Sequence, residues 1–465
     1  MKNKFKAIKN ILLGILVVFL INIAFIHLFP NTLMAYDSHD YFLKSYNFVN
    51  ENGFSFLNYP HYFRGYVYPF YIFFCRNLFG FLGFTDIDSF KVANALGLSI
   101  FLGGILPYYL KSVLKVRTSI LQVAILSIVL NFFYPGLMQS TLTDMFAVIF
   151  YLMGIFIFID IYKNRQRSTI FIFFASFFAS SFFYFAYNAR TIYMFSVAIV
   201  FISFIVYMMK NTRYLQMSIA ICAIVIGITI AALPQIAVNY QTTNKISYSV
   251  PVQVIPGMTE NLNLFQLRAG IMYQRYQTYV GNDQTINPGN AYYDLTGMDV
   301  LDIENVEYFE SYGHYISVVL KHPFKMLGVY FRNICNFLDN RFGEIYVLDL
   351  KTNKTLHVTT NLLILSIFGT GLYFTLKNKK MNSLFIVNMI SFIMPSLFLI
   401  PGAPEIRFFI PVFLYIYTFV IYNLDYKIYF NDLMKEKYKC FIITFIIVVI
   451  LLFVWNNSYL NMNTL

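Results

Sequence analysis

Residues 36 to 71 gather more ionisable side chains than any apolar segment of the chain. Asp37 and Asp40 follow the first apolar run, where water can keep a carboxylate ionised while one wall stays apolar. Asp37 is therefore a candidate general base, and Arg64 supplies a fixed cation further along the same stretch. A carboxylate base facing a cation suits attack on an anionic, phosphate-linked substrate. The alternative is that the aspartates begin a short surface helix and that Arg64 reaches lipid headgroups.

Four other ionisable residues are predicted to lie on the same side of the membrane as this stretch. Asp144 opens an apolar run after LMQSTLT, Arg190 closes another in YNAR, and Glu405 and Arg407 lie within PGAPEIRFFIP. Each has a simpler interpretation: a helix N-cap for Asp144, a headgroup contact for Arg190, and a local ion pair for Glu405 with Arg407. Their convergence on one face favours a shared site.

A divalent metal ion is a further option for the first loop. His39 and His61 could bind one together with Asp37 or Asp40, but their spacing does not form a tight ligand set. The four cysteines are scattered and contain no CxxC pair. The sequence therefore predicts no certain cofactor and leaves the metal open.

The composition is that of a membrane protein. Hydrophobic residues make up 58% and charged residues 12% of the chain, whereas soluble domains hold about 25% charged residues. The net charge is +12, and the lysines and arginines lie mostly in short breaks between apolar runs. They are therefore topology signals, and nucleic acid is not an expected partner.

The alternation of basic breaks predicts the topology. Lys2, Lys4, Lys6 and Lys9 precede a span at residues 10–29, so the N-terminus is expected in the cytoplasm and the next loop outside. The other predicted spans are residues 88–110, 119–138, 143–162, 168–187, 191–209, 216–235, 358–376, 382–400, 408–424 and 440–456. The prediction is an all-α polytopic protein with about eleven transmembrane helices and an external C-terminus.

Three parts are expected along the chain. Residues 1–235 form an N-terminal transmembrane module whose first outer loop, residues 30–87, carries two interfacial helices at 38–51 and 65–80. Residues 236–357 form a mixed external domain, with an amphipathic helix at the outer surface over 315–338. Residues 358–465 form a C-terminal transmembrane module.

The order of these motifs resembles a known family. An outer-loop DSHDY, in which Tyr41 follows Asp37 by four residues, precedes FRGYVYPFYIFFCRNLFG. The later motifs are LTDMF, YNART, LPQIAVNY and EIRFFIP. In this order they look like the membrane glycosyltransferases of the GT-C fold, and are most similar to protein O-mannosyltransferases and bacterial lipid A aminoarabinose transferases. The likeness covers most of the chain.

The resemblance implies an enzyme that uses a polyprenyl-phosphate sugar donor on the outer face of the cytoplasmic membrane. Asp37 would be the base toward a glycan, lipid or protein acceptor. Arg64 and Arg190 would bind the donor phosphate, and Asp144, Glu405 and Arg407 would shape the substrate site. Asp40 and Tyr41, in the same loop as Asp37, are also expected to bind substrate, although Asp40 has no catalytic counterpart in the family loop. The chain departs from the aminoarabinose pattern because the acidic-basic pair before proline is absent from its first loop.

Two other classes are open. A polysaccharide polymerase or ligase also has many spans and a large outer loop, but relies on arginines rather than on a first-loop aspartate. A lipid-linked-sugar flippase or transporter calls for ionisable residues near mid-membrane, and the predicted spans are nearly free of charge.

Overall fold

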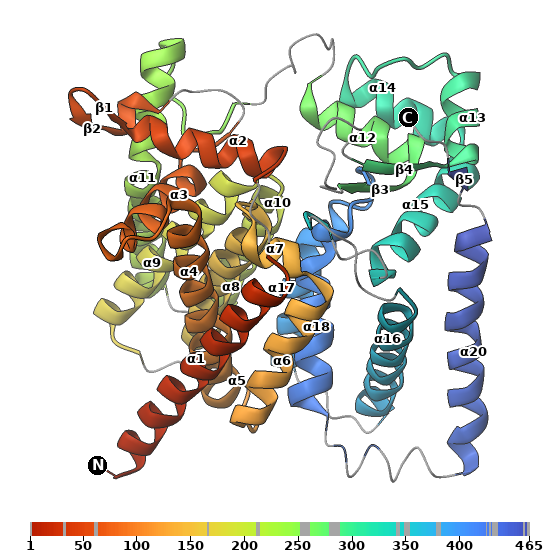
Figure 1. Ribbon diagram of the computed structural model, residues 1–465, viewed down its shortest axis with the longest axis horizontal. Helices are drawn as coiled ribbons and strands as arrows, with labels where there is room; N and C mark the ends of the chain where they lie inside the picture. Colours follow the sequence, from red (N-terminus) through yellow and green to blue (C-terminus); the bar gives the residue numbers. More distant parts are fainter. Residues whose placement is uncertain are drawn as a thin grey trace. The chain divides into compact units, whose positions relative to one another are not determined.

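The computed structural model describes residues 2–30, 34–59, 64–164, 167–210, 214–251, 261–278, 289–340, 345–347, 354–377, 383–424, 426, 429, 436–458 and 461–462. The protein is almost entirely α-helical (Figure 1). It divides into two compact units. The first unit is Met1–Ile128, Leu137–Pro251 and Val387–Pro395, and the second unit is Val129–Gly136, Val252–Ile386 and Ser396–Leu465.

Helices and short strands make up most of the described part of the chain. Up to residue 243 they are α1 (Lys2–Leu28), α2 (Asp37–Lys44), β1 (Val49–Asn50), β2 (Gly53–Phe54), α3 (Val67–Leu78), α4 (Asp86–Ser99), α5 (Leu106–Ser112), α6 (Ile120–Phe133), α7 (Pro135–Gln139), α8 (Thr143–Lys163), α9 (Thr169–Ala189), α10 (Tyr193–Lys210) and α11 (Tyr214–Thr243). Beyond it they are α12 (Leu262–Met272), β3 (Tyr273–Thr278), β4 (Gly289–Tyr293), α13 (Leu295–Ile303), α14 (Tyr312–Lys321), α15 (Pro323–Leu338), α16 (Lys354–Lys377), α17 (Ser383–Leu397), α18 (Ile410–Thr418), α20 (Glu436–Ser458) and β5 (Asn461–Met462).

Eight helices of the described part are long and apolar enough to cross a membrane, which makes the chain a multi-pass membrane protein. They are Ile8–Leu28, Asp86–Ser112, Thr143–Lys163, Thr169–Ala189, Tyr193–Lys210, Tyr214–Thr243, Lys354–Lys377 and Ile406–Asn423. Each overlaps one of the predicted spans. The other three predicted spans overlap the shorter apolar helices Ile120–Phe133, Phe385–Leu397 and Ile443–Asn456.

Close packing fixes α1 in the first unit. A Cβ added to Gly14 would stand 2.5 Å from the carbonyl oxygen of Gly103, so the two backbones touch where only glycine fits. Further along α1, Asn22 Nδ2 donates to the Ala95 carbonyl at 3.3 Å and to Ser99 Oγ at 3.2 Å. These contacts hold the end of α1 that leads into the first loop.

The first loop is less helical than expected. The helix predicted over 38–51 is the shorter α2, and a 3₁₀ turn and the β1–β2 hairpin follow it. Gly53, the first residue of β2 after the turn, has a φ of 94° that is accessible mainly to glycine. The second predicted helix, over 65–80, is α3. Figure 1 shows α2, β1 and β2 together at the end of the first unit opposite to the N-terminus of α1.

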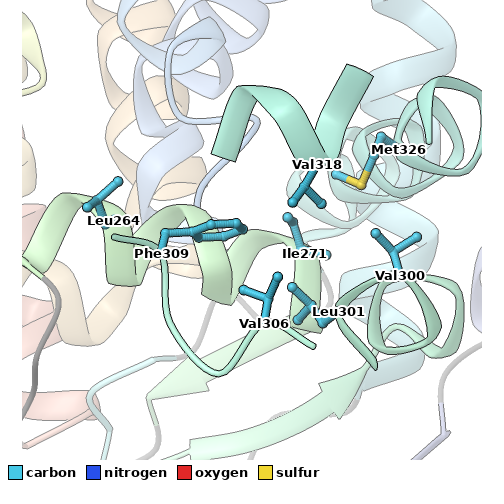
Figure 2. Close-up of a cluster of buried hydrophobic side chains, with 8 residues drawn as sticks. All are labelled: Leu264, Ile271, Val300, Leu301, Val306, Phe309, Val318 and Met326. Atoms are coloured by element: carbon cyan, nitrogen blue, oxygen red, sulfur yellow. The ribbon is translucent and has the colours of Figure 1, made fainter. Parts of the chain in front are cut away.

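The second unit contains a mixed domain, defined as α12 to α15 with the antiparallel sheet β3-β4-β5. Its apolar core is formed by Leu264, Ile271, Val300, Leu301, Val306, Phe309, Val318 and Met326 (Figure 2). β5 follows α20 and pairs with β4, so the last described residues belong to this sheet. The helix predicted over 315–338 is divided into α14 and α15, because Pro323 lacks an N–H and begins a new helix.

Candidate functional site

The first candidate pair joins the start of α2 to the segment before α3. Arg64 Nη2 donates to Asp37 Oδ1 at 2.6 Å, and its Nε lies 3.6 Å from Asp40 Oδ2. The guanidinium also lies 4.7 Å from the centroid of the Tyr41 ring. Both aspartates occupy the first turn of α2, where the helix dipole favours negative charge. Four of the predicted site residues therefore form one cluster.

Two features suit this cluster to chemistry rather than to packing alone. The side chain of Asp37 keeps 34% of its surface exposed, so water and a substrate can reach the carboxylate. The preceding residue, Tyr36, has φ 51° and ψ −126°, a conformation that non-glycine residues rarely adopt. Such strain is concentrated at functional sites. The aspartates do begin a short helix, as the simpler interpretation held, but Arg64 binds them.

The second candidate pair joins α8 to α9. Arg190 and Asp144 form an ion pair in which the carboxylate side chain is only 3% exposed and the guanidinium side chain 17%. Asp144 is not the N-cap of α8, because that position belongs to Leu142, and no side chain caps the helix there. Arg190 is the residue directly after α9. The guanidinium of Arg190 thus pairs with a buried carboxylate at a helix N-terminus, where both the cation and the helix dipole favour negative charge.

A hydroxyl pair fixes the first cluster beside Asp144. Ser38, next to Asp37, shares a hydrogen bond of 2.8 Å with the hydroxyl of Thr141 and accepts the Thr141 backbone N–H at 3.0 Å. Both side chains are buried. Thr141 lies three residues before Asp144, so the first turn of α2 and the start of α8 are held together.

An amide network fixes the two arginines. Asn188, two residues before Arg190, accepts the Val67 N–H at 2.9 Å and donates to Gln235 Oε1 at 3.0 Å. Gln235 Oε1 also accepts the Tyr66 N–H at 3.3 Å. The segment after Arg64 is thereby bound to the end of α9. These amides were not among the predicted site residues; the signal in the sequence was polar side chains inside apolar runs, in YNAR and LPQIAVNY.

Tyr59 stabilises the backbone of the segment that carries Arg64. Its hydroxyl donates to the carbonyls of Arg64 and Gly65, each at 3.2 Å. Burial raises the pKa of the Tyr59 hydroxyl well above its usual value, so it stays protonated and keeps donating. The backbone around Arg64 is therefore held by the Tyr59 hydroxyl and by the side chains of Asn188 and Gln235.

The far end of α2 has its own anchor, which sequence reasoning missed. Arg76 Nη1 lies 2.8 Å from Asp86 Oδ2, and its guanidinium stacks 3.6 Å from the centroid of the Tyr46 ring. The Tyr46 hydroxyl donates to Asp86 at 2.7 Å. Since Tyr46 follows α2 closely, this cluster fixes the helix relative to α3 and α4.

An apolar cavity of about 200 Å³ lies within the first unit. Residues of α3, α4 and α8 line it, among them Tyr68, Asn94 and Phe146. The Tyr68 ring contacts the Tyr41 ring, with centroids 5.3 Å apart, and the Phe146 ring, at 5.2 Å. Tyr41 in turn lies against Arg64, so one aromatic chain connects the cavity to the charged cluster.

Glu405 and Arg407 form a local ion pair in the second unit. Arg407 Nε donates to Glu405 Oε2 at 2.5 Å, and its Nη1 lies 3.5 Å from the Tyr346 hydroxyl. Unlike the exposed pair that the simpler interpretation assumed, both residues are buried. Their expected contribution to the same site as Asp37 stays a prediction, because they belong to the other unit.

The metal hypothesis receives no support from the described part of the chain. There, no group of three or more histidine, cysteine or acidic residues is arranged to hold a metal ion. His39 is exposed, and His61 lies outside the described residues. The metal therefore stays open.

No family model, no curated protein and no solved structure matches this chain.

Proposed function

We propose that the protein is a glycosyltransferase that moves a sugar from a polyprenyl-phosphate donor to an acceptor on the outer face of the cytoplasmic membrane. The observation that carries the proposal is the pairing of a reachable carboxylate, Asp37, with Arg64, on segments tied to the Asp144–Arg190 pair. The resemblance of the motif order to GT-C glycosyltransferases agrees with it. The acceptor is a lipid-linked glycan, a cell-surface polymer or a protein.

The two arginines suit the donor phosphate. A guanidinium can hold two phosphate oxygens at once, and it stabilises the charge that develops on the leaving phosphate. The two arginine side chains are similarly exposed, at 19% for Arg64 and 17% for Arg190, but the carboxylates paired with Arg64 are 34% and 37% exposed, against 3% for the Asp144 carboxylate. Asp144 keeps Arg190 oriented.

Asp37 suits the acceptor. An acceptor hydroxyl or amine attacks the anomeric carbon, and the bond from that carbon to the phosphate oxygen breaks. The polyprenyl phosphate leaves with the electron pair, and the acceptor proton passes to Asp37. In the structure Arg64 binds Asp37. A donor phosphate that takes over Arg64 frees this carboxylate for the proton.

The apolar cavity supports a lipid-linked donor. Its lining of tyrosine, phenylalanine and aliphatic side chains suits an isoprenoid chain. It is connected through Tyr68 and Tyr41 to Arg64, so a phosphate at Arg64 can carry its first isoprene units toward the cavity.

The proposal includes a topology of eleven spans with the N-terminus in the cytoplasm. The eleven spans are the eight long helices and three more, formed by α6 together with α7, by α17 and by α20. In this topology the candidate site lies on the outer side of the membrane, and residues 236–357 form an external domain. Within the first unit, Lys163 donates to the Val113 carbonyl and so joins the ends of α8 and α5 away from Asp144. Lysine at these ends agrees with a cytoplasmic side there.

The test compares glycans of cells with and without this gene. Mass spectrometry of lipid-linked and surface glycans should show one sugar missing from an acceptor, together with an accumulated polyprenyl-phosphate sugar. Wild-type protein should restore the product, and the Asp37→Asn variant at equal abundance should not. Restoration by Asp37→Asn, with loss only in arginine variants, would favour a polysaccharide polymerase or ligase. Unchanged glycans would contradict the proposed function.

A further inference from the structure

Helix α15 has an apolar face that the mixed domain does not cover. Phe324, Leu327 and Phe331 are 88%, 67% and 43% exposed. Their spacing of three and four residues aligns them along one stripe of the helix. On the opposite face, Met326 and Val329 are buried, and Figure 2 shows Met326 among the core side chains. An aligned row of large exposed side chains marks an interaction surface.

The apolar stripe of α15 contacts the C-terminal end of α20. The rings of Phe331 and Trp455 have centroids 6.2 Å apart. Below Trp455, α20 exposes a row of aliphatic side chains that includes Ile447, Leu451 and Val454. Tryptophan is typical of the level where a transmembrane helix meets the lipid headgroups. The stripe of α15 therefore continues a lipid-facing surface at headgroup level, and Figure 1 shows α15 beside this end of α20.

A buried amide network holds α15 and α20 in this relation. Asn456 Nδ2 donates to Asn336 Oδ1 at 2.8 Å, and Gln274 Nε2 donates to the Asn456 carbonyl at 2.9 Å. All three side chains are buried. Because Asn456 follows Trp455 and Asn336 is in α15, the apolar stripe cannot turn away from the end of α20 without breaking these bonds.

Basic side chains accompany the stripe. Lys321 and Lys325 flank its start, and their side chains are 58% and 41% exposed although they pair with Glu304 and Asp299. Lysine beside an apolar helix face is typical of helices that lie in the plane of a membrane, where the ammonium reaches lipid phosphates.

We propose that α15 lies in the outer leaflet of the bilayer, with Phe324 and Leu327 inserted between lipids, so that the mixed domain is bound to the membrane surface. The inference rests on the proposed span of α20. The occupant of the stripe is lipid, because the stripe is continuous with the aliphatic row of α20 and has lysines at headgroup level.

The chain has one tryptophan, which allows a depth measurement. Three proteins are reconstituted into phosphatidylcholine vesicles: the wild type, Trp455→Phe with Phe324→Trp, and Trp455→Phe with Tyr308→Trp as the matched control. Tyr308 is an exposed aromatic residue of the same domain, in the loop between α13 and α14. Emission is compared in plain lipid and in lipid that carries bromine near either end of the acyl chain.

We expect brominated lipid to quench the tryptophan at position 324 and wild-type Trp455, most strongly when the bromine is near the headgroup, and to leave the position-308 protein unchanged. Quenching of Trp455 without quenching at position 324 would overturn the inference while the span of α20 stands. Absence of quenching at both positions would contradict the span as well. If emission at position 324 changes only with the protein-to-lipid ratio, a second copy covers the stripe and the inference is wrong.

Discussion

Gly65 lies directly against Asn188. A Cβ at position 65 would stand 2.3 Å from both the backbone carbonyl oxygen and the side-chain Oδ1 of Asn188. Real Cβ atoms do not approach so closely, so only glycine lets the two segments touch. Because Arg64 precedes Gly65 and Arg190 follows Asn188 by two residues, this contact sets the spacing of the two backbone segments that carry the arginines.

Gly65→Ala should therefore disturb the candidate site more than a methyl group added at any other position of the first loop. We expect a loss of about 1–3 kcal/mol in stability, as for overpacking elsewhere. Turnover should fall by about 10²-fold, since a displacement of about 1 Å at a reacting centre has that effect. Thermal unfolding and initial rates measure the two effects.

Gly80→Ala is the matched control, because a Cβ there meets no atom within 4 Å. It should change neither quantity. If Gly65→Ala behaves like the control, the Gly65–Asn188 contact does not position the arginines.

Asp37→Asn should leave the protein folded and reduce turnover by about two orders of magnitude or more, the usual scale for a general base. The fold should survive because the Asp37 side chain is 34% exposed and asparagine still accepts a hydrogen bond from Arg64. Asp40→Asn is the comparison: Asp40 lies at 3.6 Å from Arg64 Nε and also pairs with Lys44, so its loss should matter less. Equal turnover of the wild type and Asp37→Asn would refute the role of Asp37 as base.

Patterns that act locally were readable in the sequence. Apolar runs and basic breaks predicted each of the eight helices in the described part of the chain that are long enough to cross a membrane. The boundary charges Asp37 and Arg64 indicated a cluster, which the structure brings together. Asp144 and Arg190 were expected on one face, and they form a pair. Each of these predictions depends on composition or on position relative to the membrane.

Contacts between distant segments were not readable. The bond between Ser38 and Thr141 joins residues with no pattern in common. Asn188 and Gln235 are both polar residues inside apolar runs, but nothing in the sequence shows that they bind each other. Such amides and hydroxyls look like ordinary polar residues at the ends of spans until the helices are packed. The pairing of β5 with β4 was missed because a two-residue strand has no periodicity to detect.

The mixed domain should lose stability in acid through Glu304. Lys321 donates to Glu304 Oε2 at 2.6 Å and the His322 ring lies 2.9 Å from Oε1. These hydrogen bonds lower the pKa of the Glu304 carboxyl from its usual value of 4.5. A carboxyl with a lowered folded pKa stabilises the protein fully above its unfolded pKa, and this stabilisation disappears as the pH falls through the folded pKa.

Below pH 4.5, the unfolding temperature of the wild type should therefore fall more steeply than that of Glu304→Gln. Trp455 fluorescence reports the unfolding, since the indole contacts Phe331 of the same domain. Glu307→Gln, at an exposed neighbouring position, should keep the wild-type slope. Parallel curves for the wild type and Glu304→Gln would show that this carboxyl contributes nothing to the acid response.

The topology predicts opposite accessibility for the two ends of the first unit. In a protein whose native cysteines are replaced, a cysteine at Asn52, in the turn between β1 and β2, should react with a membrane-impermeant thiol reagent in whole cells. A cysteine at Lys210, the last residue of α10, should react only after lysis. Labelling at position 210 alone would invert the topology and move Asp37 to the cytoplasmic side.

The Asp144–Arg190 pair allows structural and catalytic roles to be separated. Arg190→Gln leaves the 3%-exposed Asp144 carboxylate without its cation, and breaking a buried pair in this way should cost about 3–5 kcal/mol of stability. Asp144→Asn combined with Arg190→Gln removes both charges and should recover most of that stability. If Arg190 only supports the fold, the double variant should also recover turnover.

If Arg190 binds the donor phosphate, the double variant should recover stability but not turnover. The double variant should keep a raised KM for the lipid-linked sugar while the acceptor KM changes little, because only the donor carries the phosphate. Arg190→Lys keeps the charge but loses the planar guanidinium that can bind two phosphate oxygens at once. Its donor KM should therefore rise, with a smaller loss of stability than in Arg190→Gln. Unfolding curves and initial rates against each substrate measure these effects. Equal changes in both KM values would assign Arg190 to the structure, and donor binding would then depend on Arg64.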